Sequence, residues 1–159
     1  MSPTLIARRR FLLALLLTVL PAAFARAELQ HFPTASLTIM TAGGPHEFAV
    51  EVATTPAQLE QGLMFRQHLA PDAGMIFDFA EPQRVAMWMK NTWIPLDMLF
   101  VDARGRIVNI RQRAVPGSLE PIAAAAPVRA VIELNGGTAA RLGIRPGDRV
   151  IYPIFGDAK

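Results

Sequence analysis

The chain has 159 residues, no cysteine and a formal net charge of +3. Its basic excess lies in residues 1–27, which hold four of the 16 Lys and Arg residues and none of the 13 Asp and Glu residues, so 12 basic and 13 acidic residues remain after them. This balance excludes the electrostatic footprint of a nucleic-acid-binding protein, and the lack of cysteine excludes disulfides, thiolate zinc sites and a cysteine nucleophile.

The first 27 residues have the pattern of a secretory signal peptide. Arg8–Arg10 form a basic start, residues 11–20 are an almost unbroken apolar run, and Ala25-Arg26-Ala27 is a small-x-small cleavage triplet. The run is shorter than the roughly 20 residues that cross a bilayer, so we expect a cleaved signal and no membrane span afterwards. The general and twin-arginine export routes both fit this start. We therefore expect an exported protein, periplasmic or secreted.

We divide the chain into three segments: the signal peptide over residues 1–27, an N-terminal extension over 28–45 and a single globular domain over 46–156. In the domain, residues 47–53 alternate between apolar and polar and predict a half-buried strand. Thr55, Pro56 and Gln58 then form a capping box that starts a helix. We expect this helix to end near Leu69.

Further strands are predicted from short apolar runs, and the last of them is interrupted by a proline. A hairpin turn at Asp102–Gly105 requires a positive φ at Gly105, and Thr138–Leu142 forms one helical turn that Gly143 stops. Because many short strands need their edges covered, we predict an α+β, mainly β fold: a small, partly closed β-barrel-like domain of about six or seven short strands with one short helix. The predicted runs are residues 74–79, 85–92, 96–101, 106–111, 128–134 and 150–155.

Several sequence blocks carry a family resemblance. They are Gly62–Arg66 (GLMFR), Gly74–Phe77 (GMIF), Trp88–Thr92 (WMKNT), Ile94–Asp97 (IPLD) and Glu133–Asn135 (ELN). The chain resembles the domain-of-unknown-function family one hundred and ninety-two, a family of often exported bacterial and archaeal proteins. The resemblance implies a compact, mainly β fold with a short helix, and it implies no established activity.

The Trp88–Thr92 block suggests a ligand-binding wall. If residues 87–92 form a strand, alternation places Trp88, Lys90 and Thr92 on one face. An indole can stack on a sugar ring or an organic cation, and an ammonium can hold a carboxylate or phosphate. The alternative is that Trp88 packs in the core while Lys90 pairs with an acid or extends to solvent.

Two acids interrupt apolar strands, Asp97 and Glu133. Buried as anions, they would need partners, because an unpaired buried charge is very unfavourable. Arg66 and Lys90 are the nearest candidates within the motifs. This pattern fits an ion-pair network that stabilises the fold, or a cleft with Asp97 and Glu133 as candidate catalytic groups for acid–base work.

Met87 and Met89 offer a third possibility, since thioethers select Cu(I). Against it, methionine is a common core residue, and the family usually has phenylalanine at the position of Met87.

Together these features predict a non-enzymatic envelope accessory or ligand-binding module with no cofactor. Its partner would be an unknown small molecule or an envelope protein, and not a nucleic acid. A hydrolase acting on an envelope glycan or small anionic substrate is the first alternative, and a Cu(I) carrier that uses Met87 and Met89 is the second. The predicted ligand-binding residues are Arg66, Trp88, Lys90, Asn91, Thr92 and Asp97.

Overall fold

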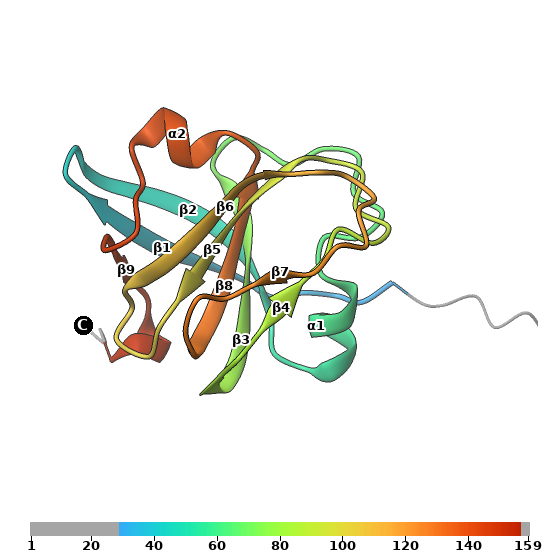
Figure 1. Cartoon of the computed structure of the whole chain (residues 1–159), viewed down its shortest axis with the longest axis horizontal. Coiled ribbons are helices and arrows are strands. Elements are labelled where there is room, and N and C mark those ends of the chain that lie inside the picture. The colour runs from blue at the N-terminus through green and yellow to red at the C-terminus, as the bar shows by residue number, and fades with distance from the viewer. Residues whose placement is uncertain (1–28, 157–159) are drawn as a thin grey trace, which may run out of the picture.

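Strands dominate the structure, a computed structural model that describes residues 29–156. The predicted signal peptide over residues 1–27 lies outside the described residues. Figure 1 shows the order of the elements along the chain. The strands are β1 (Thr34–Thr41), β2 (Gly44–Ala53), β3 (Ala73–Gln83), β4 (Ala86–Met87), β5 (Leu96–Val101), β6 (Ile107–Ala114), β7 (Ile122–Ala123), β8 (Val128–Asn135) and β9 (Arg149–Ile151). The helices are α1 (Pro56–Gln61), α2 (Thr138–Leu142) and the 3-10 helix η1 (Pro153–Phe155).

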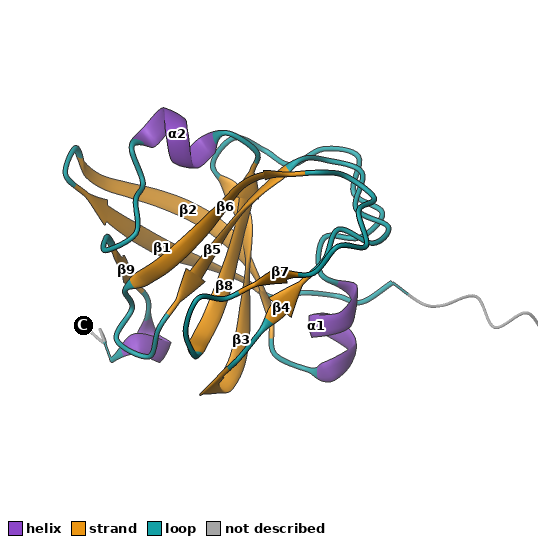
Figure 2. Cartoon of the chain, in the orientation of Figure 1, coloured by secondary structure: helices purple, strands orange, loops and turns teal. Residues whose placement is uncertain are grey.

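Seven strands form one sheet in the order β6-β5-β8-β3-β2-β1-β9, in which only β2 and β3 run parallel. The two ends of this sheet approach each other. Arg106 forms an isolated antiparallel bridge with Arg149, and the Val150 N–H donates a 2.7 Å hydrogen bond to the Gly105 carbonyl. The sheet therefore curls into a partly closed barrel (Figure 2), which confirms the predicted fold class.

The central strands β3, β5 and β8 are covered on both faces, as the all-buried pattern of β5 indicates. Leu99 of β5 and Ile132 of β8 pack inside the barrel with residues of β1, β2 and β9. Met98 and Val131, one position away on the same strands, pack in a second core with α1 and the chain around β4. Because successive strand residues point to opposite faces, each central strand serves both cores.

The first strand lies within the segment expected as an extension. Residues 34–41 pair with β2 on one side and with β9 on the other. Leu37 and Ile39 alternate with Ser36 and Thr38 and are almost fully buried, which is the period of a half-buried strand. The sheet thus begins before residue 46.

Two local predictions were wrong in extent. The capping box at Thr55 is present, but α1 ends at Gln61 because Gly62 leaves the helical conformation with φ +48°. The strand expected over 85–92 is limited to β4, which pairs with β7 in a small separate ribbon. No described helix has the length and apolar character needed to span a membrane.

Candidate functional site

A cavity of about 150 Å³ lies between α1, the sheet and the segment that carries β4. Residues 59–64 of α1 and its C-terminal turn form one wall, and residues 85–88 with Thr92 form another. Phe77 and Phe79 of β3 and Glu133 of β8 line it from the sheet. Figure 1 shows α1 next to the β4–β7 ribbon, at this side of the barrel.

Gly62 allows α1 to pack tightly against the sheet at this cavity. A Cβ atom on Gly62 would lie 2.8 Å from Cζ of Phe77, closer than real Cβ atoms approach. Its positive φ and its N–H bond to the Gln58 carbonyl end the helix there. The glycine therefore fixes the distance between the helical wall and the aromatic wall.

Two acids line the cavity, Glu60 and Glu133, and Glu133 is the one that belongs to the sheet. Glu133 is 4% exposed. Its cross-strand neighbours are Met75 on β3 and Met98 on β5, both fully buried. Among the described residues, no hydrogen bond or ion pair reaches its carboxyl group. Burial raises its pKa from 4.5 to about 8, because desolvation disfavours the carboxylate. The cavity thus contains a carboxyl group that is mostly protonated at neutral pH.

The segment from Trp88 to Thr92 is a loop fixed by backbone hydrogen bonds, not a continuous strand. Met89 N–H donates to the Ser118 carbonyl at 3.0 Å, and Gly117 N–H donates to the Thr92 carbonyl at 3.0 Å. Asn91 adopts a left-handed φ of +53°, which asparagine tolerates better than most residues. These bonds hold Trp88 at the rim of the cavity and turn Met89 into the core.

Trp88 is 44% exposed and lines the cavity, so it is not a core tryptophan. The Nζ atom of Lys90 lies 4.9 Å from the centroid of its ring, in a cation–π contact. Thr92 is buried and also lines the cavity, and its hydroxyl donates to the Lys90 carbonyl at 3.2 Å. Three residues predicted for the ligand-binding wall are therefore together, although the strand geometry behind that prediction is absent.

The remaining predicted ligand-binding residues are placed differently. Arg66 lies beside the sheet, where its Nη2 atom pairs with Oε2 of Glu51 at 2.6 Å. Asn91 is exposed, and its amide group donates to the sulfur of Met64, a cavity residue, at 3.8 Å. Neither side chain lines the cavity.

Asp97 lies on the opposite side of the sheet. It is fully buried and faces Leu134, whose side chain belongs to the barrel interior. Its carboxylate accepts hydrogen bonds from the backbone N–H groups of Arg113, Gly137 and Ala139, at 2.8, 2.9 and 2.8 Å. These contacts tie β5 to the start of α2, and they place the two candidate catalytic acids on different faces.

The two candidate Cu(I) ligands also differ in position. Met87 is half-buried and lines the cavity, whereas Met89 is fully buried in the second core. The described residues contain no group of three or more His, Asp or Glu side chains that could hold a metal ion.

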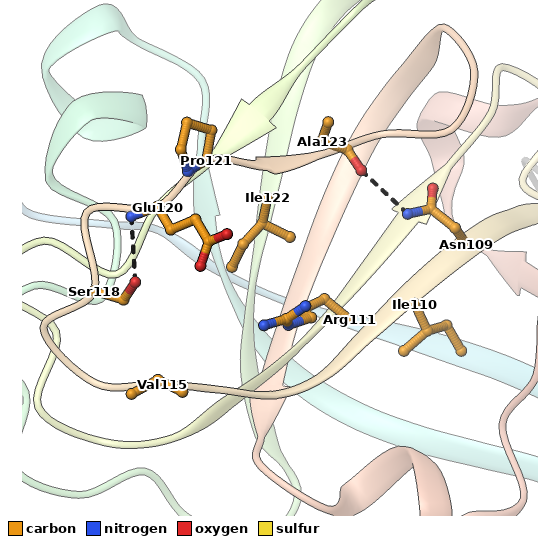
Figure 3. Close-up of a pocket in the computed structure, with 9 residues that line it drawn as sticks. All are labelled: Asn109, Ile110, Arg111, Val115, Ser118, Glu120, Pro121, Ile122 and Ala123. Atoms are coloured by element: carbon orange, nitrogen blue, oxygen red, sulfur yellow. Dashed lines mark hydrogen bonds between the residues drawn. The ribbon is translucent and has the colours of Figure 1, made fainter.

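A larger cavity of about 290 Å³ lies under the segment of residues 115–123 (Figure 3). Arg111 of β6 and Glu120 of the covering segment project into it from opposite sides. Both are exposed, and the cavity holds none of the residues of the Trp88–Thr92 block. The smaller cavity is the stronger candidate, because it combines a desolvated carboxyl group with the motif residues.

The sequence predicts Glu133 as a candidate catalytic residue and Trp88 and Thr92 as candidate ligand-binding residues, and all three line this cavity. It does not predict Phe77 or Phe79, which also line the cavity. Leu59 and Leu63 have the spacing of one helical turn, which predicts a buried face but not its partner. The partner is set by long-range packing of α1 against β3, separated from it by a loop. No signal in the local sequence identifies that contact.

Comparison with known proteins identifies one matching family and similar solved structures. The sequence profile of the DUF192 family, described as "Uncharacterized ACR", matches residues 38–152. A Sinorhizobium meliloti 1021 protein described as a "putative transcription regulator" has 48% identity and a TM-score of 0.74; the match covers 77% of this chain and 96% of that one. A Novosphingobium aromaticivorans DSM 12444 protein of unknown function has 44% identity and a TM-score of 0.74, with coverage of 85% and 94%. None of the curated proteins matches. The chain belongs to the DUF192 family.

Proposed function

We propose that this protein is an exported ligand-binding module, and that a small organic molecule inserts one group into the cavity beside α1. The observation that carries the proposal is Glu133, which is 4% exposed, lines this cavity, and has no hydrogen bond or ion pair to its carboxyl group among the described residues. Buried polar groups are nearly always hydrogen-bonded, so a carboxyl group that faces a cavity without a protein partner needs water or a ligand as its partner. A ligand atom that bonds to Glu133 would supply the missing partner.

The shape of the site supports insertion of one group only. A volume of about 150 Å³ corresponds to a benzene-sized guest. The exposed indole of Trp88 at the rim offers a stacking surface for the part of the ligand that stays outside. Export is proposed from the basic, apolar and small-residue segments of residues 1–27.

The test is a thermal-shift screen of the chain from Glu28 to Lys159 against sugars, amines, small acids and peptidoglycan fragments. A ligand of the native state raises the melting temperature by mass action. We expect the shift to disappear in Trp88→Ala and to persist in Trp93→Ala, because Trp93 is also exposed but does not line the cavity. Equal loss in both variants would refute this site.

Acid catalysis is the second candidate function, on the strength of the raised pKa of Glu133. A carboxyl group that keeps its proton to about pH 8 suits a general acid, and Glu60 at the cavity edge is a second carboxyl group. On this hypothesis Glu133→Gln retains the fold and loses turnover of an envelope glycan or small anionic substrate. Turnover that survives in Glu133→Gln would exclude it.

A further inference from the structure

We infer that the group bound in this cavity is a small protonated alkylamine whose ammonium contacts Glu133; this inference rests on the proposed function. It goes further by naming the charge and size of the ligand.

The lining is suited to a cation. It contains two acidic residues, Glu60 and Glu133, and no lysine, arginine or histidine. Most of the remaining surface is apolar, and three aromatic residues contribute to it: Phe77, Phe79 and Trp88. Aromatic faces attract cations through the ring quadrupole, most strongly where water is excluded. An anion would meet no positive partner among the residues that line the cavity, and Lys90, outside the lining, is held against Trp88.

Trp88 already binds an ammonium group. Lys90 Nζ lies 4.9 Å from the ring centroid, and Lys90 is itself exposed. The contact is therefore made at the rim, where solvent weakens it. It shows that the indole of a cavity residue already serves as a cation-binding surface. A ligand ammonium deeper in the cavity would gain both the desolvated aromatic surroundings and the Glu133 carboxylate.

The Glu133 carboxylate lacks a hydrogen-bond donor among the described residues, and this favours an amine that carries N–H groups. A carboxylate accepts hydrogen bonds, and none of the described residues donates one to it. A protonated amine donates as many as three, while a quaternary ammonium donates none. A benzene-sized space holds an ammonium with a few methylene groups. An ammonium group on a short alkyl chain occurs in free amines, in lysine side chains of peptides and in aminolipids.

Binding would be coupled to proton release. Alone, the Glu133 carboxyl group keeps its proton to about pH 8 because it is desolvated, and a bound cation lowers the pKa of that group. The other charged groups near it do not replace the ligand: Glu60 is acidic, Arg66 pairs with Glu51, and Lys90 lies on Trp88. Its neighbours on β3 and β5 are uncharged methionines. Near neutral pH, about one proton should therefore leave Glu133 for each amine bound.

The experiment compares n-butylamine with n-butanol, which has the same shape and no charge at neutral pH. Binding to the chain from Glu28 is followed by amide chemical shifts, and proton release by calorimetry in buffers of different ionisation enthalpy. We expect at least tenfold tighter binding of the amine, with release of a proton. In Glu133→Gln the preference should disappear, and in the matched control Glu120→Gln, outside the cavity, it should persist.

The outcomes separate the two proposals. Equal binding of amine and alcohol at the cavity would overturn the amine inference and leave the ligand-binding function standing. Shifts confined to residues outside the cavity, or no shifts with any compound, would overturn both. The proton-release measurement needs no variant, so the inference remains testable if Glu133→Gln fails to fold. Binding of a lysine-containing peptide, and of vesicles that contain phosphatidylethanolamine, then shows whether the ammonium group comes from a free amine, a peptide or an aminolipid.

Discussion

Asp97 and Glu133 are on adjacent strands of one sheet but point to opposite faces. Asp97 faces Leu134 and the barrel interior, while Glu133 faces Met98 and the cavity beside α1. The two acids therefore cannot form one catalytic pair, and they have different partners: three backbone N–H groups for Asp97 and none among the described residues for Glu133.

Replacing Asp97 tests its role in holding α2. Asp97→Ala removes the acceptor of three backbone hydrogen bonds, and each buried N–H left unpaired is unfavourable by about 1–3 kcal/mol. We expect the free energy of unfolding to fall by at least about 3 kcal/mol, measured by urea denaturation. Asp72→Ala, at an exposed residue, is the control and should change it little. A small loss in Asp97→Ala would refute this role.

The pH dependence of stability tests the state of Glu133. The folded protein holds this proton up to about pH 8, whereas an unperturbed glutamate releases it near 4.5. Between these values the folded state binds more protons than the unfolded state, so stability should decrease as pH rises, by about 1.4 kcal/mol per pH unit at most. Glu133→Gln should remove this slope. Identical melting temperature profiles for the two proteins from pH 5 to about pH 8 would contradict the raised pKa.

Substitution of Gly74 by alanine tests how closely β3 and β8 approach each other beside Glu133. A Cβ at this position would lie 2.6 Å from the Glu133 carbonyl oxygen and 2.7 Å from Cδ2 of Leu134. Since the carbonyl belongs to a central strand, Gly74→Ala should destabilise the fold by about 1–3 kcal/mol. Gly43→Ala, where the nearest atom is 3.6 Å away, is the matched control. Thermal unfolding that does not distinguish the two variants would refute the close approach.

The export proposal predicts the N-terminus of the mature protein. Expression of the full chain in a bacterium should yield a product that begins at Glu28, because Ala25-Arg26-Ala27 provides the cleavage triplet. Mass spectrometry of the periplasmic and culture fractions measures this directly. An intact chain that remains with the cells would argue against a cleaved signal.

The fold could be predicted because its signals are local. The capping box of α1, the turn at Gly105 and the alternation in β2 each depend on a few neighbouring residues. The family motifs also contain Trp88 and Thr92, the two candidate ligand-binding residues that line the cavity. The strand expected over 85–92 failed because backbone bonds from Ser118 and Gly117 hold Met89 and Thr92 in a loop, and the sequence of that segment contains no trace of those distant partners.

The opposite positions of the two acids could not be predicted either. Both interrupt apolar strands in the same way, so their sequence contexts look alike. What differs is strand register: Asp97 pairs with Leu134, and a shift of one residue would have placed it beside Glu133. The register depends on the packing of the whole sheet, so the sequence of either strand alone does not determine it.

The closing of the barrel has a consequence for the order in which the molecule can assemble. β9, near the end of the described chain, pairs with β1 near its beginning and bridges to Arg106. If the chain is exported as an extended thread with its N-terminus first, as the general export route would require, these contacts cannot form until nearly all of the chain has passed through the membrane. On that export proposal, closure of the barrel would be a late step on the far side of the membrane.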